Sequence, residues 1–116
     1  MATLTEPHFD SDGDNTAQAV KTTRGDIYYI NVTNQNTADA YLQLFDAAAG
    51  SVSVGTTAPI QSYLIPGGDG TNSGGLTQEF YNAPIHFENA ITYACTTTAT
   101  GSTDPTAGLT VNILYR

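Results

Sequence analysis

The chain has 116 residues and a formal net charge of −8, because only three basic residues accompany eleven acidic ones. Hydrophobic residues make up 40% of the chain, which fits one globular domain with one small core rather than a disordered segment. Binding to phosphates or to anionic lipids needs clustered Lys and Arg, so we expect no nucleic-acid partner and no membrane partner.

The first 25 residues are polar, interrupted by glycine, and without hydrophobic periodicity. Only Leu4, Phe9 and Val20 are apolar enough to anchor them. We therefore predict an extended N-terminal arm over residues 1–25 and a folded domain over residues 26–116. No stretch of the chain approaches the roughly 18 apolar residues of a transmembrane helix, and no basic and apolar leader pattern opens it.

Three carboxylates alternate in this arm, at Asp10, Asp12 and Asp14, as they do at the first, third and fifth positions of an EF-hand calcium loop. The resemblance stops there, because the sixth position holds Asn15 instead of Gly and the twelfth holds Lys21 instead of a bidentate Glu. The pattern favours a solvated acidic loop and no cofactor, with calcium at the three carboxylates as the alternative.

From Asp26 onward, short runs alternate between apolar and polar residues. In the run 26–34, Tyr28, Ile30 and Val32 fall on one face of an extended chain, which predicts a strand. The run Leu109–Tyr115 alternates in the same way and predicts another.

The segment 38–49 fits two patterns. Its apolar residues match helical spacing, with Thr37 as a cap and Gly50 as a stop. The turn-like segment 34–39 before it would instead form a hairpin with the preceding strand, so we prefer a strand at Ala40–Phe45.

Gly-rich and Pro-rich breaks separate the remaining runs. Further strands are predicted at Ser51–Val54, Gln61–Ile65, Thr77–Tyr81, Ile85–Phe87 and Ala90–Thr97. Seven or eight short strands spaced in this way indicate an all-β, single-domain antiparallel β-sandwich with jelly-roll-like connections, with a closed barrel as the alternative.

Few residues could support catalysis. His8 lies in the arm, and His86 alternates out of the apolar face of its strand, which predicts a surface position. A glycosidase-like site would require Glu79 and Glu88 to converge with His86 in a cleft. Cys95 lies in an apolar run, as a buried, inert thiol would. We therefore expect no enzymatic activity.

A series of strand and turn motifs runs from residue 28 to residue 116: Ile30-Asn-Val-Thr-Asn34, Tyr41-Leu-Gln-Leu-Phe-Asp46, Val54-Gly-Thr-Thr-Ala-Pro59, Ile65-Pro-Gly-Gly68, Ile85-His-Phe87, Ala90-Ile-Thr-Tyr-Ala-Cys-Thr97 and Val111-Asn-Ile-Leu-Tyr-Arg116. Through these motifs the chain resembles small β-rich structural proteins of tailed bacteriophages, and the resemblance covers about three quarters of its length. Such motifs carry no catalytic residues.

The resemblance implies a virion component, most like a head decoration (cement) protein on the capsid exterior that stabilises the head. Its partners would be the major capsid protein and further copies of itself in a homotrimer, with Leu4 and Phe9 of the arm contacting the capsid. The alternative is a receptor- or carbohydrate-binding module of a tail fibre or spike, in which Tyr29, Tyr63 and Tyr81 would stack on sugar rings.

Overall fold

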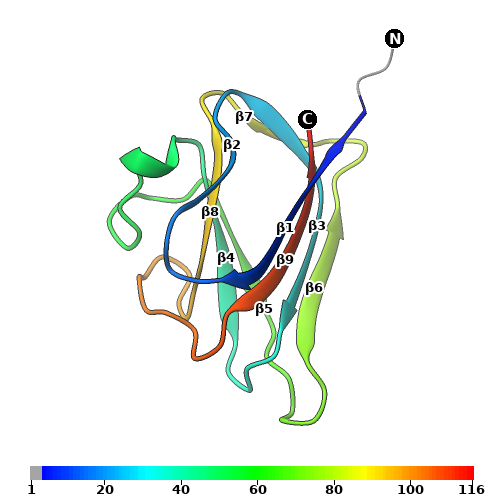
Figure 1. Ribbon diagram of the computed structural model, residues 1–116, viewed down its shortest axis with the longest axis vertical. Helices are drawn as coiled ribbons and strands as arrows, with labels where there is room; N and C mark the ends of the chain where they lie inside the picture. Colours follow the sequence, from blue (N-terminus) through cyan, green and yellow to red (C-terminus); the bar gives the residue numbers. More distant parts are fainter. Residues whose placement is uncertain (1–3) are drawn as a thin grey trace.

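The structure, a computed structural model, describes residues 4–116 as two antiparallel β-sheets packed face to face (Figure 1). The prediction of an all-β sandwich is confirmed. Within the described residues the elements are β1 (Glu6–Gly13), β2 (Gln18–Lys21), β3 (Gly25–Asn34), β4 (Ala40–Phe45), the 3₁₀ helix η1 (Ala49–Ser51), β5 (Gln61–Ile65), β6 (Gly74–Glu79), β7 (Ile85–Phe87), β8 (Ile91–Thr96) and β9 (Leu109–Tyr115).

The strand order is that of a jelly roll. Sheet A has the order β1-β9-β3-β6, with the short β7 also paired to β3, and sheet B has the order β2-β8-β4-β5. The chain crosses between the sheets at every connection except β4–β5 and β6–β7. Counting β6 and β7 as one interrupted position gives the eight-stranded double Greek key. The closed-barrel alternative is excluded because the two sheets are separate.

The core lies between the sheets and follows the predicted alternation. Ile30 and Val32 of β3 are fully buried, while Asn31 between them faces outward. A register shift between Ile27 and Tyr29 changes the phase at the start of β3, so Ile27 is buried where the sequence pattern placed Tyr28. The full core cluster comprises Ile27, Ile30, Val32, Ala40, Leu42, Leu44, Ile65, Phe87, Ile91, Tyr93, Cys95, Leu109, Val111 and Ile113.

The N-terminal segment differs from the predicted arm. Residues 6–13 form β1, an edge strand of sheet A paired with β9, and residues 18–21 form β2, an edge strand of sheet B paired with β8. The boundary at residue 25 therefore separates no arm from the sandwich, since both sheets include strands from residues 1–25. Residues 1–3 lie outside the described part of the chain.

Polar side chains, not apolar ones, attach β1 to the opposite sheet. The Tyr93 hydroxyl of β8 donates to Asp10 Oδ2 at 2.6 Å, and His8 Nε2 lies 3.0 Å from the same hydroxyl oxygen. The His8 and Tyr93 rings meet edge to face at 5.5 Å. Because the inward positions of β1 are a histidine and an aspartate, hydrophobic periodicity could not reveal this strand.

Two predicted strands differ from the structure by more than one residue at an end. Ser51–Val54 is not a strand, because it follows η1 into a turn in which Ser53 N donates to Thr57 Oγ1. The strand predicted at Thr77–Tyr81 begins earlier and ends earlier, at Gly74–Glu79. Gly74 and Gly75 pair with the end of β3 and leave no room for a Cβ against neighbouring backbone, so these glycines belong to the strand rather than to a break.

The two sheets differ on their outer faces. Loop segments 46–60 and 97–108 lie against the outer face of sheet B, and all six residues of β8 are consequently buried (Figure 1). The two loops also touch each other, since a Cβ on Gly55 would lie only 2.8 Å from Cβ of Ser102. On sheet A, by contrast, alternate residues of β3 and β9 remain partly exposed. The outer face of sheet A is therefore not covered in this way by the two loops.

Candidate functional site

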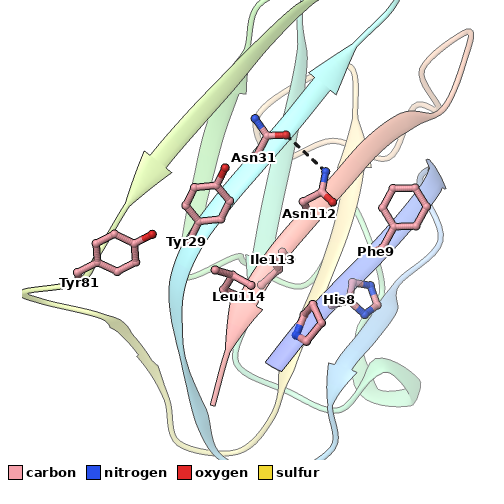
Figure 2. Close-up of a pocket in the computed structure, with 9 residues that line it drawn as sticks. His8, Phe9, Tyr29, Asn31, Tyr81, Asn112, Ile113 and Leu114 are labelled. Carbon is pink, nitrogen blue, oxygen red and sulfur yellow. Dashed lines mark hydrogen bonds between the residues drawn. The ribbon is translucent and has the colours of Figure 1, made fainter. Parts of the chain in front are cut away.

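An open groove of about 530 Å³ lies on the outer face of sheet A (Figure 2). Aromatic rings stand on its two sides: Phe9 rises from β1, while Tyr29 of β3 and Tyr81, just after β6, stand opposite. The side chains of Asn31 and Asn112 lie between them. We call this surface the sheet A groove; its lining residues are Pro7, His8, Phe9, Tyr29, Asn31, Tyr81, Asn112, Ile113 and Leu114.

Strand register assembles the groove from three segments that are distant in sequence. Phe9 lies opposite Asn112, and Asn112 in turn lies opposite Asn31. The adjacent row brings Leu114 opposite Tyr29. Because residues of one row point to the same face of a sheet, the register alone fixes these side chains as neighbours.

The amides at the centre of the groove form a short hydrogen-bonded chain. Asn31 Nδ2 donates to Thr77 Oγ1 at 2.7 Å, and Asn112 Nδ2 donates to Asn31 Oδ1 at 3.4 Å. These bonds orient both amides across the sheet. The Asn112 carbonyl oxygen and the Thr77 hydroxyl proton remain available to a ligand or a partner surface.

The groove carries no formal charge near neutral pH. Its lining includes no Asp, Glu, Lys or Arg. The ring of its one histidine, His8, is directed inward to Tyr93, and partial burial lowers the pKa of His8, although the nearby Asp10 opposes this shift. Since the Tyr93 hydroxyl gives its proton to Asp10, neutral His8 donates its Nε2 proton to the Tyr93 oxygen. The groove thus combines aromatic rings, amides and apolar atoms, which suits an uncharged partner.

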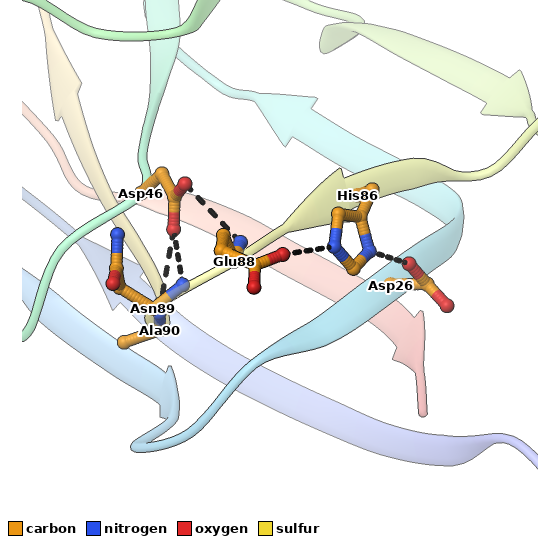
Figure 3. A network of polar contacts seen from close by, with 6 residues as sticks. All are labelled: Asp26, Asp46, His86, Glu88, Asn89 and Ala90. Atoms are coloured by element: carbon orange, nitrogen blue, oxygen red, sulfur yellow. Dashed lines mark hydrogen bonds and ion pairs between the residues drawn. The ribbon is translucent and has the colours of Figure 1, made fainter.

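A second polar cluster lies around His86 at the N-terminal end of β3, where β7 pairs with it (Figure 3). His86 Nδ1 lies 2.7 Å from Asp26 Oδ1, and His86 Nε2 lies 2.9 Å from Glu88 Oε2. Hydrogen bonds from both ring nitrogens to carboxylates, first Glu88 and then Asp26, raise the pKa of His86. The side chain of His86 is 57% exposed, which confirms its predicted surface position.

The structure does not assemble the glycosidase-like triad considered above. His86 pairs with Glu88, but Glu79 lies opposite Tyr29, three positions along β3 from the residue opposite His86. The partner of His86 that sequence reasoning missed is Asp26. The antiparallel pairing of β7 with β3 places Asp26 opposite His86, and no local pattern reveals that register.

Asp46 organises the turn that follows this cluster. Its carboxylate accepts backbone N–H bonds from Glu88, Asn89 and Ala90, at 3.2, 2.8 and 3.4 Å (Figure 3). Partial burial raises the pKa of Asp46, but these three bonds outweigh burial and the net shift is downward. The role of Asp46 in the structure is therefore that of a turn cap between β7 and β8.

The acidic residues predicted as a loop lie on β1 and in the connection that follows it. Asp10 faces inward to Tyr93, Asp12 is exposed, and Asp14 Oδ1 accepts a bond from Thr16 N. Among residues 4–116, no group of three or more His, Cys, Asp or Glu side chains is arranged to hold a metal ion. The structure thus offers no geometry to support calcium at these carboxylates.

The two residues expected to contact a capsid are both exposed. Phe9 is 65% exposed and lines the sheet A groove, whereas Leu4, which precedes β1, is 82% exposed. Cys95 is fully buried, as predicted, and burial strongly raises the pKa of its thiol. Sequence reasoning missed Asn112 and Leu114 as surface residues of the groove, although the alternation of β9 already placed both on the face opposite the core.

Comparison with known families and with curated proteins gave no match for this chain. Among the residues that the structure describes, no helix has the length and apolar character needed to cross a membrane.

Proposed function

We propose that this chain is a non-enzymatic structural protein of a bacteriophage virion, a decoration or cement protein that binds the exterior of the capsid and stabilises the head. The observation that carries the proposal is the uncovered outer face of sheet A, with the sheet A groove at its centre. The jelly-roll order supports it as well, because viral capsid domains commonly use this architecture.

The chemistry of the exposed face supports adhesion to protein rather than catalysis. Tyr, Phe and Asn side chains provide contact area and hydrogen bonds without charges that would have to be desolvated. Phe9 and Tyr81 are the most exposed aromatic side chains of the groove, at 65% and 55%. Residues with large, rigid rings of this kind are typical anchors of interfaces.

In this proposal, β1 has the role that was expected of a free arm. Phe9 contacts the capsid from a strand that the sheet holds in place, and Leu4 extends the contact beyond the strand. A preformed surface loses less conformational entropy on binding than an arm that orders only when it binds. Several copies, each making a modest contact on the capsid lattice, would together attach firmly.

The proposal is tested by mixing the purified protein with capsids that lack it and measuring occupancy by co-sedimentation. We expect the wild type to saturate the capsid surface. We expect Phe9→Ser with Tyr81→Ser to reduce the affinity by about 100-fold, since each loses an anchor worth roughly 1–2 kcal/mol.

The matched control removes exposed apolar side chains elsewhere. Ile60 and Leu64 are 43% and 45% exposed and lie at or beside β5 of sheet B, away from the groove. Ile60→Ser with Leu64→Ser should leave occupancy unchanged. Failure of the wild type to bind capsids, or equal losses in both double variants, would argue against the proposal.

The groove also favours a second candidate function, a receptor- or carbohydrate-binding module of a tail fibre or spike. Rings of Tyr29 and Tyr81 beside the amides of Asn31 and Asn112 resemble a sugar site, in which stacking and neutral hydrogen bonds act together. Lectin domains share the jelly-roll architecture with capsid domains. A volume of about 530 Å³ accommodates a small saccharide.

The same variants separate the two candidates. Titration with neutral oligosaccharides, followed through the tyrosine ring signals in NMR, should shift Tyr29 and Tyr81 if the module binds glycans. Tyr63, which packs against the core beside Phe80 at 6.1 Å, serves as the internal control. Capsid binding without any saccharide shift supports the decoration protein, and saccharide binding without capsid occupancy supports the receptor module.

A further inference from the structure

All three basic residues of this acidic chain line one surface depression. Lys21 ends β2, Arg24 lies in the turn before β3, and Arg116 directly follows β9. Together with Tyr28 and His86 they surround a shallow hollow of about 290 Å³. We call this feature the basic depression. Lys21 and Arg24 are close in sequence, and the fold brings the distant Arg116 to them.

Within residues 4–116, these cations form no ion pair with an acidic side chain. In the described part of the chain, the only ion pairs are the two that His86 makes with Asp26 and Glu88. Asp26 lines the depression too, but its carboxylate is directed to His86. With eleven acidic residues available, Lys21, Arg24 and Arg116 nevertheless stay unpaired within residues 4–116.

The depression is partly ordered in advance. The Arg116 guanidinium lies over the Tyr28 ring, 4.9 Å from its centroid, and this cation–π contact holds the charge in place. The backbone of Arg116 pairs with that of Asp26 in both directions, at 3.0 and 3.1 Å. Gly25 lines the floor, where a Cβ would collide with the Arg116 carbonyl oxygen, so the chain approaches closely at this point.

An acidic cluster lies at the other end of the same strands. Asp12 and Asp14 flank the end of β1, and Asp104 is joined to that connection because Asn15 N donates to Asp104 Oδ1 at 3.1 Å. We call Asp12, Asp14 and Asp104 the acidic cluster. Gly13 pairs with Leu109 at the start of β9, whereas Arg116 follows its end.

The two features cannot neutralise each other within one molecule. Seven residues of β9 separate them, which corresponds to roughly 23 Å at about 3.3 Å per residue. This is more than twice the Debye length of about 8–10 Å at physiological salt. Figure 1 shows the corresponding separation: the C-terminus lies near the top, and the 97–108 loop, in orange, lies in the lower half.

We infer that the basic depression of one copy binds the acidic cluster of a second copy, so that the protein self-associates head to tail. Two different patches meet in such a contact, so the interface is heterologous, and it closes into a ring when the rotation between copies allows it. A heterologous ring is the symmetry of a trimer on a capsid lattice, but the inference depends on charge placement alone and not on capsid attachment.

The inference is tested by charge exchange, with association measured by sedimentation velocity over a range of concentrations. Wild type should self-associate at about 50 mM salt and dissociate at about 500 mM, because the contact is electrostatic. Arg24→Glu with Arg116→Glu should weaken the association by about tenfold or more, since attraction becomes repulsion.

The complementary variant neutralises the other patch. Asp12→Lys with Thr103→Lys changes two exposed positions of this region, offsets the charges of Asp14 and Asp104, and spares the backbone bonds that Asp14 and Asp104 accept. This variant should also fail to associate with itself. When the two variants are mixed, the intact basic depression of this variant meets the intact acidic cluster of the other, and association should return as a dimer that contains one copy of each.

The return of association on mixing controls for misfolding and for net charge. Neither of these explains a complex that forms only when two variants that do not self-associate are combined. Arg24→Glu alone, which leaves the Arg116–Tyr28 contact intact, replaces the double variant if that one unfolds. The inference is overturned by a wild type that stays monomeric at low salt, by association that survives reversal of the basic depression, or by variants that do not associate when mixed. None of these outcomes depends on whether capsids bind the protein.

Discussion

The outer faces of the two sheets are built from similar strands but have different surroundings. On sheet B, Gln43, Phe45 and Thr92 point away from the core and are nevertheless buried, because the 46–60 and 97–108 loops cover them. On sheet A, the equivalent outward positions are partly exposed and surround a groove. The comparison shows that the chain uses its long loops to close one face and leaves the other uncovered.

The largest expected difference comes from the same substitution on the two faces. Phe45 on β4 is 1% exposed, and Phe9 on β1 is 65% exposed. We expect Phe45→Ala to lower the free energy of unfolding by about 3–5 kcal/mol through the cavity it leaves. Phe9→Ala should change it by less than about 0.5 kcal/mol. Urea denaturation of both variants gives the two values, and equal losses would mean that the faces do not differ in burial.

A smaller effect is expected from the hydrogen bonds that attach the 97–108 loop to the outer face of sheet B. Gln43 Nε2 donates to Thr96 Oγ1 at 2.7 Å and to the Gly101 carbonyl at 3.0 Å. Within the described residues its buried Oε1 has no hydrogen-bond partner. Gln43→Ala should destabilise the protein by about 1–3 kcal/mol and speed amide exchange in the 97–108 loop.

The matched control for this change is Gln78→Ala on the exposed edge strand β6. It should alter stability by less than about 0.5 kcal/mol and leave exchange in that loop unchanged. If amide exchange in the 97–108 loop stays slow in Gln43→Ala, contacts other than those of Gln43 hold this loop against sheet B.

The smallest effect concerns the two histidines, whose pKa values shift in opposite directions. Burial lowers the pKa of His8, so the folded state resists protonation and stability falls as the pH drops below about 6.5. The carboxylates of Glu88 and Asp26 raise the pKa of His86, so its contribution is complete below about pH 6.5 and is lost as the pH rises through the raised value.

Thermal unfolding between about pH 5.5 and pH 7.5 separates these contributions. His8→Gln should reduce the loss of stability on acidification, and His86→Gln should increase it. Parallel curves for both variants and the wild type would contradict the proposed difference between the two environments.

The sequence reveals those parts of the fold in which apolar residues define a face. Alternation in β3 and β9 and the turns around β4 are sufficient for the sandwich, because β3 and β9 each bury every second side chain over most of their length. For β1 the same reasoning fails, since His8 and Asp10 occupy its inward positions and contact Tyr93 of the opposite sheet, more than 80 residues away.

The candidate site is predictable only in part, for a related reason. The exposure of Phe9 and of the outward residues of β9 follows from alternation, but the register that brings Phe9, Asn112 and Asn31 into one row depends on long-range pairing. Burial of Thr92 and Thr96 on the other sheet depends on loops that cover them, and no pattern within β8 indicates those loops.

The most direct test of the central claim, that the uncovered face of sheet A contacts the capsid, is hydroxyl-radical footprinting of the protein free and bound to capsids. We predict that Phe9, Tyr29 and Tyr81 become protected on binding, while Ile60 and Leu64 react equally in both states. Protection of Ile60 and Leu64 with Phe9 and Tyr81 still reactive would place the contact on the opposite side of the molecule and contradict the account.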